Sequence, residues 1–388
     1  MPSLFPINKS MRTLFLLAAL TAFAAEPPGV VIDYSPQSSG KYIGSPSIVI
    51  LPDGSYVATH DFFGPQSGFH EAATSRVFRS KDKGRTWTHL TDLQGQFWST
   101  LFYHRKALYL IGTHKEYGDI ILRRSSDGGA TWTRAVLREG HFHCAPQPVI
   151  VHNDRVWRAM EDADGGGGWG KHFRAFMMSA PEKADLMNPE SWTTSNVLPR
   201  DPAWLGGQFN GWLEGNAVVT PQGAMKDILR VDIPSGGKVA MIDISADGKT
   251  AAFNPQTGFL DMPGGAKKFT IRFDRKSKQY WSLVNWVPPG NEKLHAARVR
   301  NTLALACSPD LKNWTVRAIL LHHPDVEKHG FQYVDWQFDG ADLIAAVRTA
   351  FDDAQGGAHN FHDANYLTFL RVKKFRTLTT SFAIPPAS

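Results

Sequence analysis

A strand–turn–strand pattern that recurs six times constrains the fold more than any other feature of the chain. Each copy has two short apolar runs, rich in Val, Ile, Leu and aromatic residues, around a turn such as Asp53-Gly54 or Asn153-Asp154. Such runs are typical of antiparallel β-hairpins. The copies occupy residues 46–61, 99–114, 146–162, 214–232, 267–286 and 332–350. The spacing leaves room for a second hairpin after each copy, which predicts a repeat of four-stranded units.

The second hairpins carry a turn motif of their own. Residues 80–87 and 125–132 both read S-x-D-x-G-x-T-W, degenerate versions begin at Ser245 and Ser308, and a looser one spans 179–192. In this pattern the Ser and Asp side chains bind turn backbone, Gly accepts a positive φ, and Trp packs beneath. We interpret the motif as a folding device and not as a catalytic one.

This motif resembles the Asp-box, or BNR repeat, of the sialidase (neuraminidase) superfamily. The resemblance implies an all-β fold, a six-bladed β-propeller of four-stranded antiparallel blades, in which residues 25–388 form a single catalytic domain. The last repeat lacks the motif. We expect its outer strands at 365–372 and 30–34 to pair, because that pairing closes the ring and removes exposed strand edges.

The N-terminus has the layout of a secretory signal. Lys9 and Arg12 precede an apolar run that ends near Ala22-Phe23-Ala24, a small-x-small cleavage pattern. We therefore predict a signal peptide over residues 1–24 and a protein secreted to the periplasm or the extracellular space. No later stretch has the length of uninterrupted apolar residues that a membrane helix needs.

Composition narrows the partners further. The formal net charge is +6, a mild excess that suits an acidic glycan, and no cluster of Lys or Arg indicates nucleic acid. Export permits a disulfide between Cys144 and Cys307, although two distant cysteines are equally compatible with buried thiols. No zinc-type motif occurs, so we expect no cofactor. A structural Ca²⁺ and the oligomeric state stay open.

Glu214 is the main catalytic candidate. A carboxylate that enters an apolar strand is costly to bury unless it is paired or used. The resemblance implies a catalytic glutamate at this point, followed after the turn by an arginine, here Arg230. A purely structural Glu–Arg pair is the alternative.

Two further arginines are candidates for substrate binding. Arg300 precedes one of the degenerate motifs, and Arg348 closes the sixth hairpin. Convergent guanidinium groups bind a planar carboxylate better than lysines do. Where sialidases begin their first blade with Arg-Ile-Pro, this chain has Gly44-Ser45-Pro46. Either Arg348 or Arg79 replaces the missing arginine, or the sugar is not sialic acid.

The sixth hairpin opens where sialidases carry a nucleophilic tyrosine. The spacing to the Asp339-Gly340 turn fits Gln332 and Tyr333 about equally, and Asp335 is a further candidate in the same strand. Neighbours in a strand face opposite sides. We therefore expect only one of the pair to face the axis: Tyr333 for a retaining reaction, Gln332 for an inverting one.

The general acid is less constrained. Asp61 and His60 end the first hairpin, near the place of the acid–base aspartate in sialidases. Weaker candidates, for the acid or for substrate binding, are His143, Glu161 with Asp162, and His362 with Asp363.

Three functions fit these features. The first is an exo-acting glycoside hydrolase, sialidase-like, that releases a terminal acidic sugar. The second is a polysaccharide lyase or another uronate-acting enzyme that uses His, Tyr and Arg. The third is a carbohydrate-binding propeller without catalysis.

Overall fold

Each of the six predicted hairpins is present as a pair of antiparallel strands. The structure is a computed structural model that describes residues 26–379, so the predicted signal peptide lies outside the described residues. The hairpins are β3–β4 (Ser47–Ile50, Tyr56–Phe63), β7–β8 (Phe97–His104, Ala107–Thr113), β11–β12 (Ile150–His152, Arg155–Asp162), β15–β16 (Gly211–Val219, Met225–Asp232), β20–β21 (Thr270–Asp274, Gln279–Asn285) and β24–β25 (Gly330–Asp339, Asp342–Ala350).

The outer strands pair onto these hairpins, and all pairings are antiparallel. They are β1 (Val30–Tyr34), β2 (Tyr42–Ile43), β5 (Thr74–Ser80), β6 (Thr88–Gln94), β9 (Gly118–Ser125), β10 (Thr133–His143), β13 (Arg174–Pro181), β14 (Thr193–Thr194), β17 (Lys238–Ile244), β18 (Ala251–Ala252), β19 (Phe259–Asp261), β22 (Thr302–Ser308), β23 (Thr315–His322) and β26 (Tyr366–Val372). The helices are short 3₁₀ turns at Gln37–Ser39, Pro189–Ser191, Trp204–Gly207, Ala296–Arg298 and Phe375–Thr377. None of the helices in the described part of the chain is long and apolar enough to cross a membrane.

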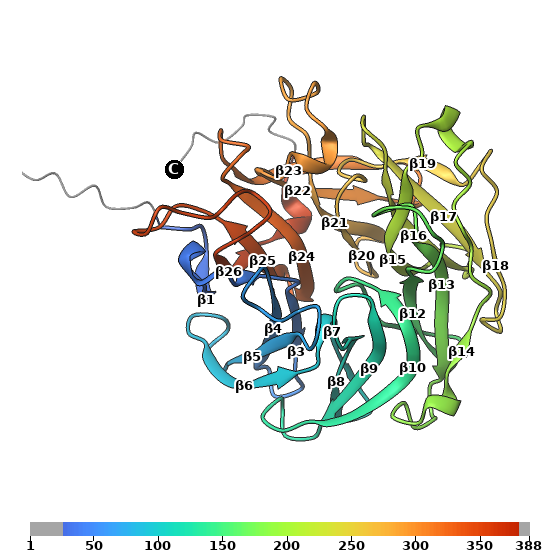
Figure 1. Cartoon of the computed structure of the whole chain (residues 1–388), viewed down its shortest axis with the longest axis horizontal. Coiled ribbons are helices and arrows are strands. Elements are labelled where there is room, and N and C mark those ends of the chain that lie inside the picture. The colour runs from blue at the N-terminus through green and yellow to red at the C-terminus, as the bar shows by residue number, and fades with distance from the viewer. Residues whose placement is uncertain (1–25, 380–388) are drawn as a thin grey trace, which may run out of the picture.

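The sheets are arranged as a β-propeller around a central axis, with β3, β7, β15, β20 and β24 toward the middle (Figure 1). The expectation of six separate blades is not met, because the described strands form five sheets. One sheet has eight strands: the long strand β10 reaches past its own hairpin and pairs with β12 at Phe142–Asp162 and His143–Glu161. Two successive four-stranded units are thereby hydrogen-bonded into one sheet.

The ring closes as the sequence predicts. Strand β1 pairs with β26, with Val30 opposite Phe369 and Tyr34 opposite Tyr366. The N-terminal strand therefore completes the last sheet and covers what would be an exposed edge.

The S-x-D-x-G-x-T-W turns form as expected. In the second copy, the Ser125 hydroxyl accepts a hydrogen bond from the Gly129 amide at 2.9 Å, and Asp127 accepts one from the Thr131 hydroxyl at 2.6 Å. Gly129 has a φ of 103°, which favours glycine. Trp132 donates to the Gly129 carbonyl at 2.9 Å. The motif stabilises the turn between β9 and β10.

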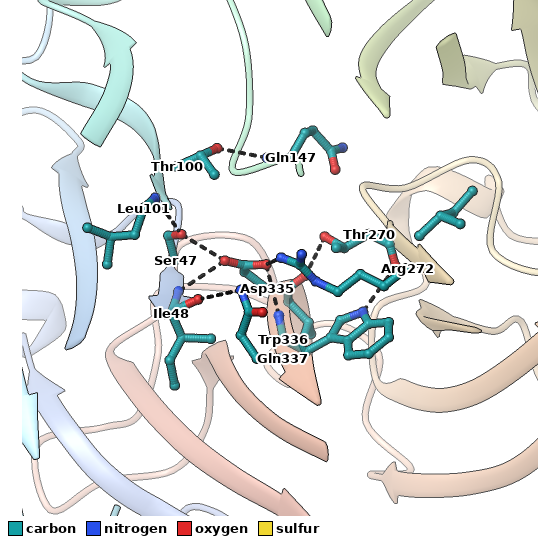
Figure 2. A network of polar contacts seen from close by, with 12 residues as sticks. Ser47, Ile48, Thr100, Leu101, Gln147, Thr270, Arg272, Asp335, Trp336 and Gln337 are labelled. Carbon is teal, nitrogen blue, oxygen red and sulfur yellow. Dashed lines mark hydrogen bonds and ion pairs between the residues drawn. The ribbon is translucent and has the colours of Figure 1, made fainter. Parts of the chain in front are cut away.

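A polar network ties the inner strands together, and Asp335 of β24 is its centre (Figure 2). Its carboxylate accepts hydrogen bonds from the Ser47 hydroxyl at 2.7 Å and the Ile48 amide at 3.0 Å, both on β3. It also pairs with Arg272 of β20 at 3.1 Å, and Ser47 in turn accepts a bond from the Leu101 amide of β7. Strands of four different sheets are thus joined at the axis.

Candidate functional site

A cavity of about 280 Å³ opens where the starts of β7, β15 and β24 meet the ends of β4, β10 and β25. Six of the candidate residues line it. Asp61, His143, Glu214, Tyr333 and Arg348 come from four different sheets, and His362 comes from the loop after β25. The other lining residues are Gly44, Ser45, Phe63, Phe69, Phe97, Trp98, Glu116, Tyr117, Cys144, Trp169 and Leu213.

Three lining residues lie on β-bulges. Trp98, Glu214 and Tyr333 have φ values of 49°, 61° and 53°, and the pairing register shifts at each of them. A bulge redirects a side chain out of the strand's alternation, and positive φ in such residues is strained backbone of the kind that gathers at functional sites. The first strands of three sheets thus use the same device to turn a side chain toward the axis.

A bulge lies at the two candidates of the sixth hairpin, Gln332 and Tyr333, and only Tyr333 is among the residues that line the cavity. Gln332 is buried beside it, where its side-chain oxygen accepts a hydrogen bond from Arg300 and its amide donates to the Phe361 carbonyl. Strict alternation fails here because the bulge adds a residue to β24 relative to β25.

A buried charged residue of the preceding sheet holds each bulge. The Asp61 carboxylate accepts a hydrogen bond from the Trp98 amide at 2.6 Å, and Glu161 accepts one from the Gly215 amide at 2.8 Å. Lys268 donates to the Val334 carbonyl at 2.7 Å. Glu161 does not line the cavity, and its carboxylate also lies 3.3 Å from His143. By holding the Gly215 amide, Glu161 positions the backbone of the neighbouring Glu214.

Glu214 and Arg230 form an ion pair of 3.1 Å in which each side chain is 2% exposed. Burial alone would raise the pKa of Glu214, but Arg230, His143 and Arg300 together lower it. The group is therefore a carboxylate at neutral pH, and it makes the Glu–Arg pair that the sequence left open as the alternative to a catalytic role.

Asp61 has the opposite electrostatics. Burial raises its pKa to about 6, although the Ser45 and Trp98 amides that it binds act to lower it. The cavity therefore holds one carboxyl group that keeps its proton in mildly acidic solution and another that does not. Such a division is what acid–base chemistry by two carboxyl groups requires.

The arginines gather around Tyr333. The Arg348 and Arg300 guanidinium carbons lie 4.8 and 5.5 Å from the centre of its ring. Burial acts to lower the pKa of Arg230, but Glu214 and Tyr333 raise it. The Nε atoms of Arg230 and Arg348 are buried without a hydrogen-bond partner within residues 26–379. The same feature occurs at Arg76, Arg158, Arg272 and Arg317, so the capacity of this cluster for an anion depends on Arg348, the arginine that lines the cavity.

Several predicted residues lie elsewhere. His60 is buried behind the cavity, where its Nε2 atom lies 2.7 Å from Asp33, and Asp335 belongs to the axial network described above. Arg79 pairs with Asp53 at 2.6 Å on an outer turn, so it does not replace the missing first arginine. Asp363 lies behind His362, which it contacts at 2.9 Å. Cys144 and Cys307 are both buried free thiols.

The cavity also has aromatic residues that the sequence did not single out. Trp98, Tyr117 and Trp169 line it together with three Phe rings. Trp169 is 51% exposed and follows a run of four glycines, which is a local signal for a loop. Nothing local to Trp98 or Tyr117 marks them, because their placement depends on the bulge and on loop packing.

Substitution of Gly44 tests the architecture of this site. A Cβ atom at this position would overlap the Asp61 carboxylate and its backbone carbonyl. We expect Gly44→Ala to displace Asp61 and lower kcat/KM about tenfold or more on a substrate found by the screen below. Gly168→Ala is the control for adding a methyl group, because a Cβ there meets no atom and its φ lies outside the left-handed region; equal losses in both variants would contradict the expectation.

Comparison with known proteins identifies related folds. No family model matches the chain, and no curated protein sequence does. Among solved structures, an α-L-arabinanase from Penicillium chrysogenum in complex with arabinobiose has a TM-score of 0.58 at 15% identity, covering 89% of this chain and 98% of its own. An α-L-arabinofuranosidase from Fusarium graminearum has a TM-score of 0.58 at 11% identity, covering 92% and 99%.

A leech intramolecular trans-sialidase is similar to the same degree, with a TM-score of 0.58 at 12% identity, covering 93% of this chain and 71% of that one. The chain has their β-propeller fold. At these identities the likeness concerns the fold, and the chemistry of the propeller has to come from its own cavity.

Proposed function

We propose that this propeller is a retaining, exo-acting glycoside hydrolase that removes a terminal acidic sugar, such as a sialic acid, from a glycan. The observation that carries the proposal is the cavity itself. It combines Asp61, whose burial raises its pKa to about 6, an ionised Glu214 and Tyr333 with Arg348 beside it. Exo-action fits a cavity of about 280 Å³, because a space of this size takes the end of a glycan and not an extended stretch of it.

In the proposed reaction, the Tyr333 hydroxyl oxygen attacks the anomeric carbon while Glu214 takes its proton. The glycosidic carbon–oxygen bond breaks, and the Asp61 carboxyl group gives its proton to the leaving oxygen. Water then attacks the glycosyl–tyrosine bond, Asp61 takes the proton of that water, and Glu214 returns a proton to Tyr333. Every group ends in its starting state.

The arginine cluster is the reason for choosing an acidic sugar. Arg348 lines the cavity, and a carboxylate offers its guanidinium a bidentate, charge-assisted partner, whereas the hydroxyl groups of a neutral sugar accept hydrogen bonds without compensating the charge. We also infer that the ring has six blades in the sialidase-like sense, with the eight-stranded sheet counted as two blades that share the β10–β12 contact.

A panel of fluorogenic 4-methylumbelliferyl glycosides tests the proposal: α-N-acetylneuraminide, β-glucuronide and α-L-arabinofuranoside. We expect release from an acidic member and, by NMR, a first product that keeps the anomeric configuration. Turnover of the arabinofuranoside alone would leave a glycosidase but remove the acidic specificity. One feature of the sequence favours a neutral sugar: Gly44 occupies the position of the first carboxylate-binding arginine of sialidases.

A uronate-specific lyase is the second candidate. It is favoured by the presence of His143 and Tyr333 in one cavity with Arg348, because these groups can abstract and donate a proton while a guanidinium neutralises the uronate. A lyase product carries a new double bond that absorbs in the ultraviolet, and hydrolysis produces none.

The pH dependence of activity follows from Asp61. The acid acts in its protonated form, and burial raises its pKa to about 6, so kcat/KM should fall as the pH rises through about 6. In Asp61→Asn this descending limb should disappear. On a glycoside with an unactivated leaving group, the loss should be about 10²-fold or more. An unchanged limb in the variant would assign the acid to another residue.

A further inference from the structure

A second cluster of ligand-type side chains lies outside the cavity. His323 and His329 are in the connection between β23 and β24, and Asp352 follows β25. One nitrogen or oxygen atom of each lies within 4.8 Å of the others. None of the three lines the cavity.

His329 has an unused ring nitrogen. The side chain is 4% exposed, and its Nδ1 atom lies 3.0 Å from the Asp325 carboxylate, to which it donates. Its Nε2 atom is buried, has no hydrogen-bond partner in the described chain, and lies 3.5 Å from an Asp352 oxygen. When the His329 ring is neutral, the lone pair of Nε2 faces the Asp352 carboxylate. This contact is repulsive unless a cation or a second proton lies between the two atoms.

The other two residues make the place accessible to a cation. The Asp352 side chain is 54% exposed. The ring of His323 stacks on that of His329, with centroids 3.4 Å apart. At present His323 uses Nδ1 to accept a hydrogen bond from the Asp325 amide at 3.1 Å. If Nε2 of His323 binds a cation, the ring proton moves to Nδ1. His323 then loses this hydrogen bond and gains a metal–nitrogen bond.

We propose that His323, His329 and Asp352 bind a divalent cation of the Zn²⁺ class, with water as the fourth ligand. Two imidazoles and one carboxylate suit Zn²⁺ and its neighbours Cu²⁺ and Ni²⁺, whereas Ca²⁺ and Mg²⁺ prefer all-oxygen sites. Asp325 then has the role that carboxylates commonly have behind a metal-bound histidine, since it orients the ring from the other nitrogen.

Such a site would join two segments that support the cavity wall. The segment after Asp352 includes Phe361 and His362, whose carbonyls accept hydrogen bonds from Gln332 and Arg348, respectively. A cation held between the two connections would restrain this segment without touching substrate. The proposal does not depend on the reaction that the cavity performs.

Titration of the untagged, chelator-treated protein with ZnCl₂ in a calorimeter tests it. We expect one Zn²⁺ per chain, no comparable binding of CaCl₂, and a rise in melting temperature on adding Zn²⁺. Co²⁺ should give the visible absorption of a four-coordinate complex.

Asp352→Asn is the main variant, because an exposed side chain can be changed without unfolding the protein. We expect at least a tenfold weaker binding of Zn²⁺ in this variant and loss of the Co²⁺ spectrum in His329→Ala. The control is His89→Gln, which removes another His–Asp pair of 2.7 Å on an outer strand and should bind as the wild type does. Absence of stoichiometric binding to the wild type, or equal binding by Asp352→Asn, would overturn the site and leave a protonated His329 between two carboxylates.

Discussion

Glu214→Gln should lower kcat/KM about 10³-fold on the acidic glycoside that the wild type hydrolyses. The amide cannot take the Tyr333 proton, and removal of a positioned general base costs about 10² to 10⁴-fold. The bulge geometry at residue 214 does not depend on the charge, since Glu161 holds the Gly215 amide. The measurement is steady-state kinetics of purified variants at the pH optimum.

Stability has to be measured beside activity, because Glu214→Gln leaves Arg230 buried without its ion-pair partner. Breaking a buried pair from one side costs about 3–5 kcal/mol. A variant that is folded by circular dichroism at the assay temperature yet inactive assigns the loss to chemistry. Glu190→Gln, at an exposed glutamate on the 3₁₀ turn at 189–191, is the control for the substitution. Near-wild-type activity of folded Glu214→Gln would remove Glu214 from the mechanism.

Asp335→Ala should lower the free energy of unfolding by about 3–5 kcal/mol. The change leaves Arg272 without its ion-pair partner and the Ser47 hydroxyl and Ile48 amide without their acceptor. Unpaired buried charges and donors carry costs of this size. Urea unfolding followed by tryptophan fluorescence measures it.

Two further variants distinguish the loss of the Asp335 contacts from the loss of a carboxylate in general. Asp335→Asn keeps an oxygen that can accept from Ser47 and should cost less than the alanine variant. Asp92→Ala removes a half-exposed carboxylate on the outer strand β6 and should stay within about 0.5 kcal/mol of the wild type. A cost for Asp335→Ala no larger than that for Asp92→Ala would mean that the axial network does not hold the sheets together.

Most of the fold could be predicted because its signals are local. Each hairpin is marked by its own apolar runs and turn residues, and Asp127 with Gly129 bends one turn through contacts within a few residues. The pairing of β1 with β26 was also predictable, since a closed ring leaves the first and last strands no other partner. The merging of two units through β10 and β12 was not, because two residue pairs at the end of a strand leave no mark in the pattern.

The candidate site divides in the same way. Local pattern together with the resemblance to sialidases selected Asp61, Glu214, Tyr333 and Arg348 as polar residues at strand ends, and all four line the cavity. Tertiary structure decided the rest: Tyr333 lines the cavity and Gln332 does not, His60 and Asp335 do not line it, and the pKa is raised in Asp61 and lowered in Glu214. The physical reason is that alternation holds only along a regular strand. A bulge, a buried partner from the next sheet and the burial that shifts a pKa all arise from residues far away in the chain.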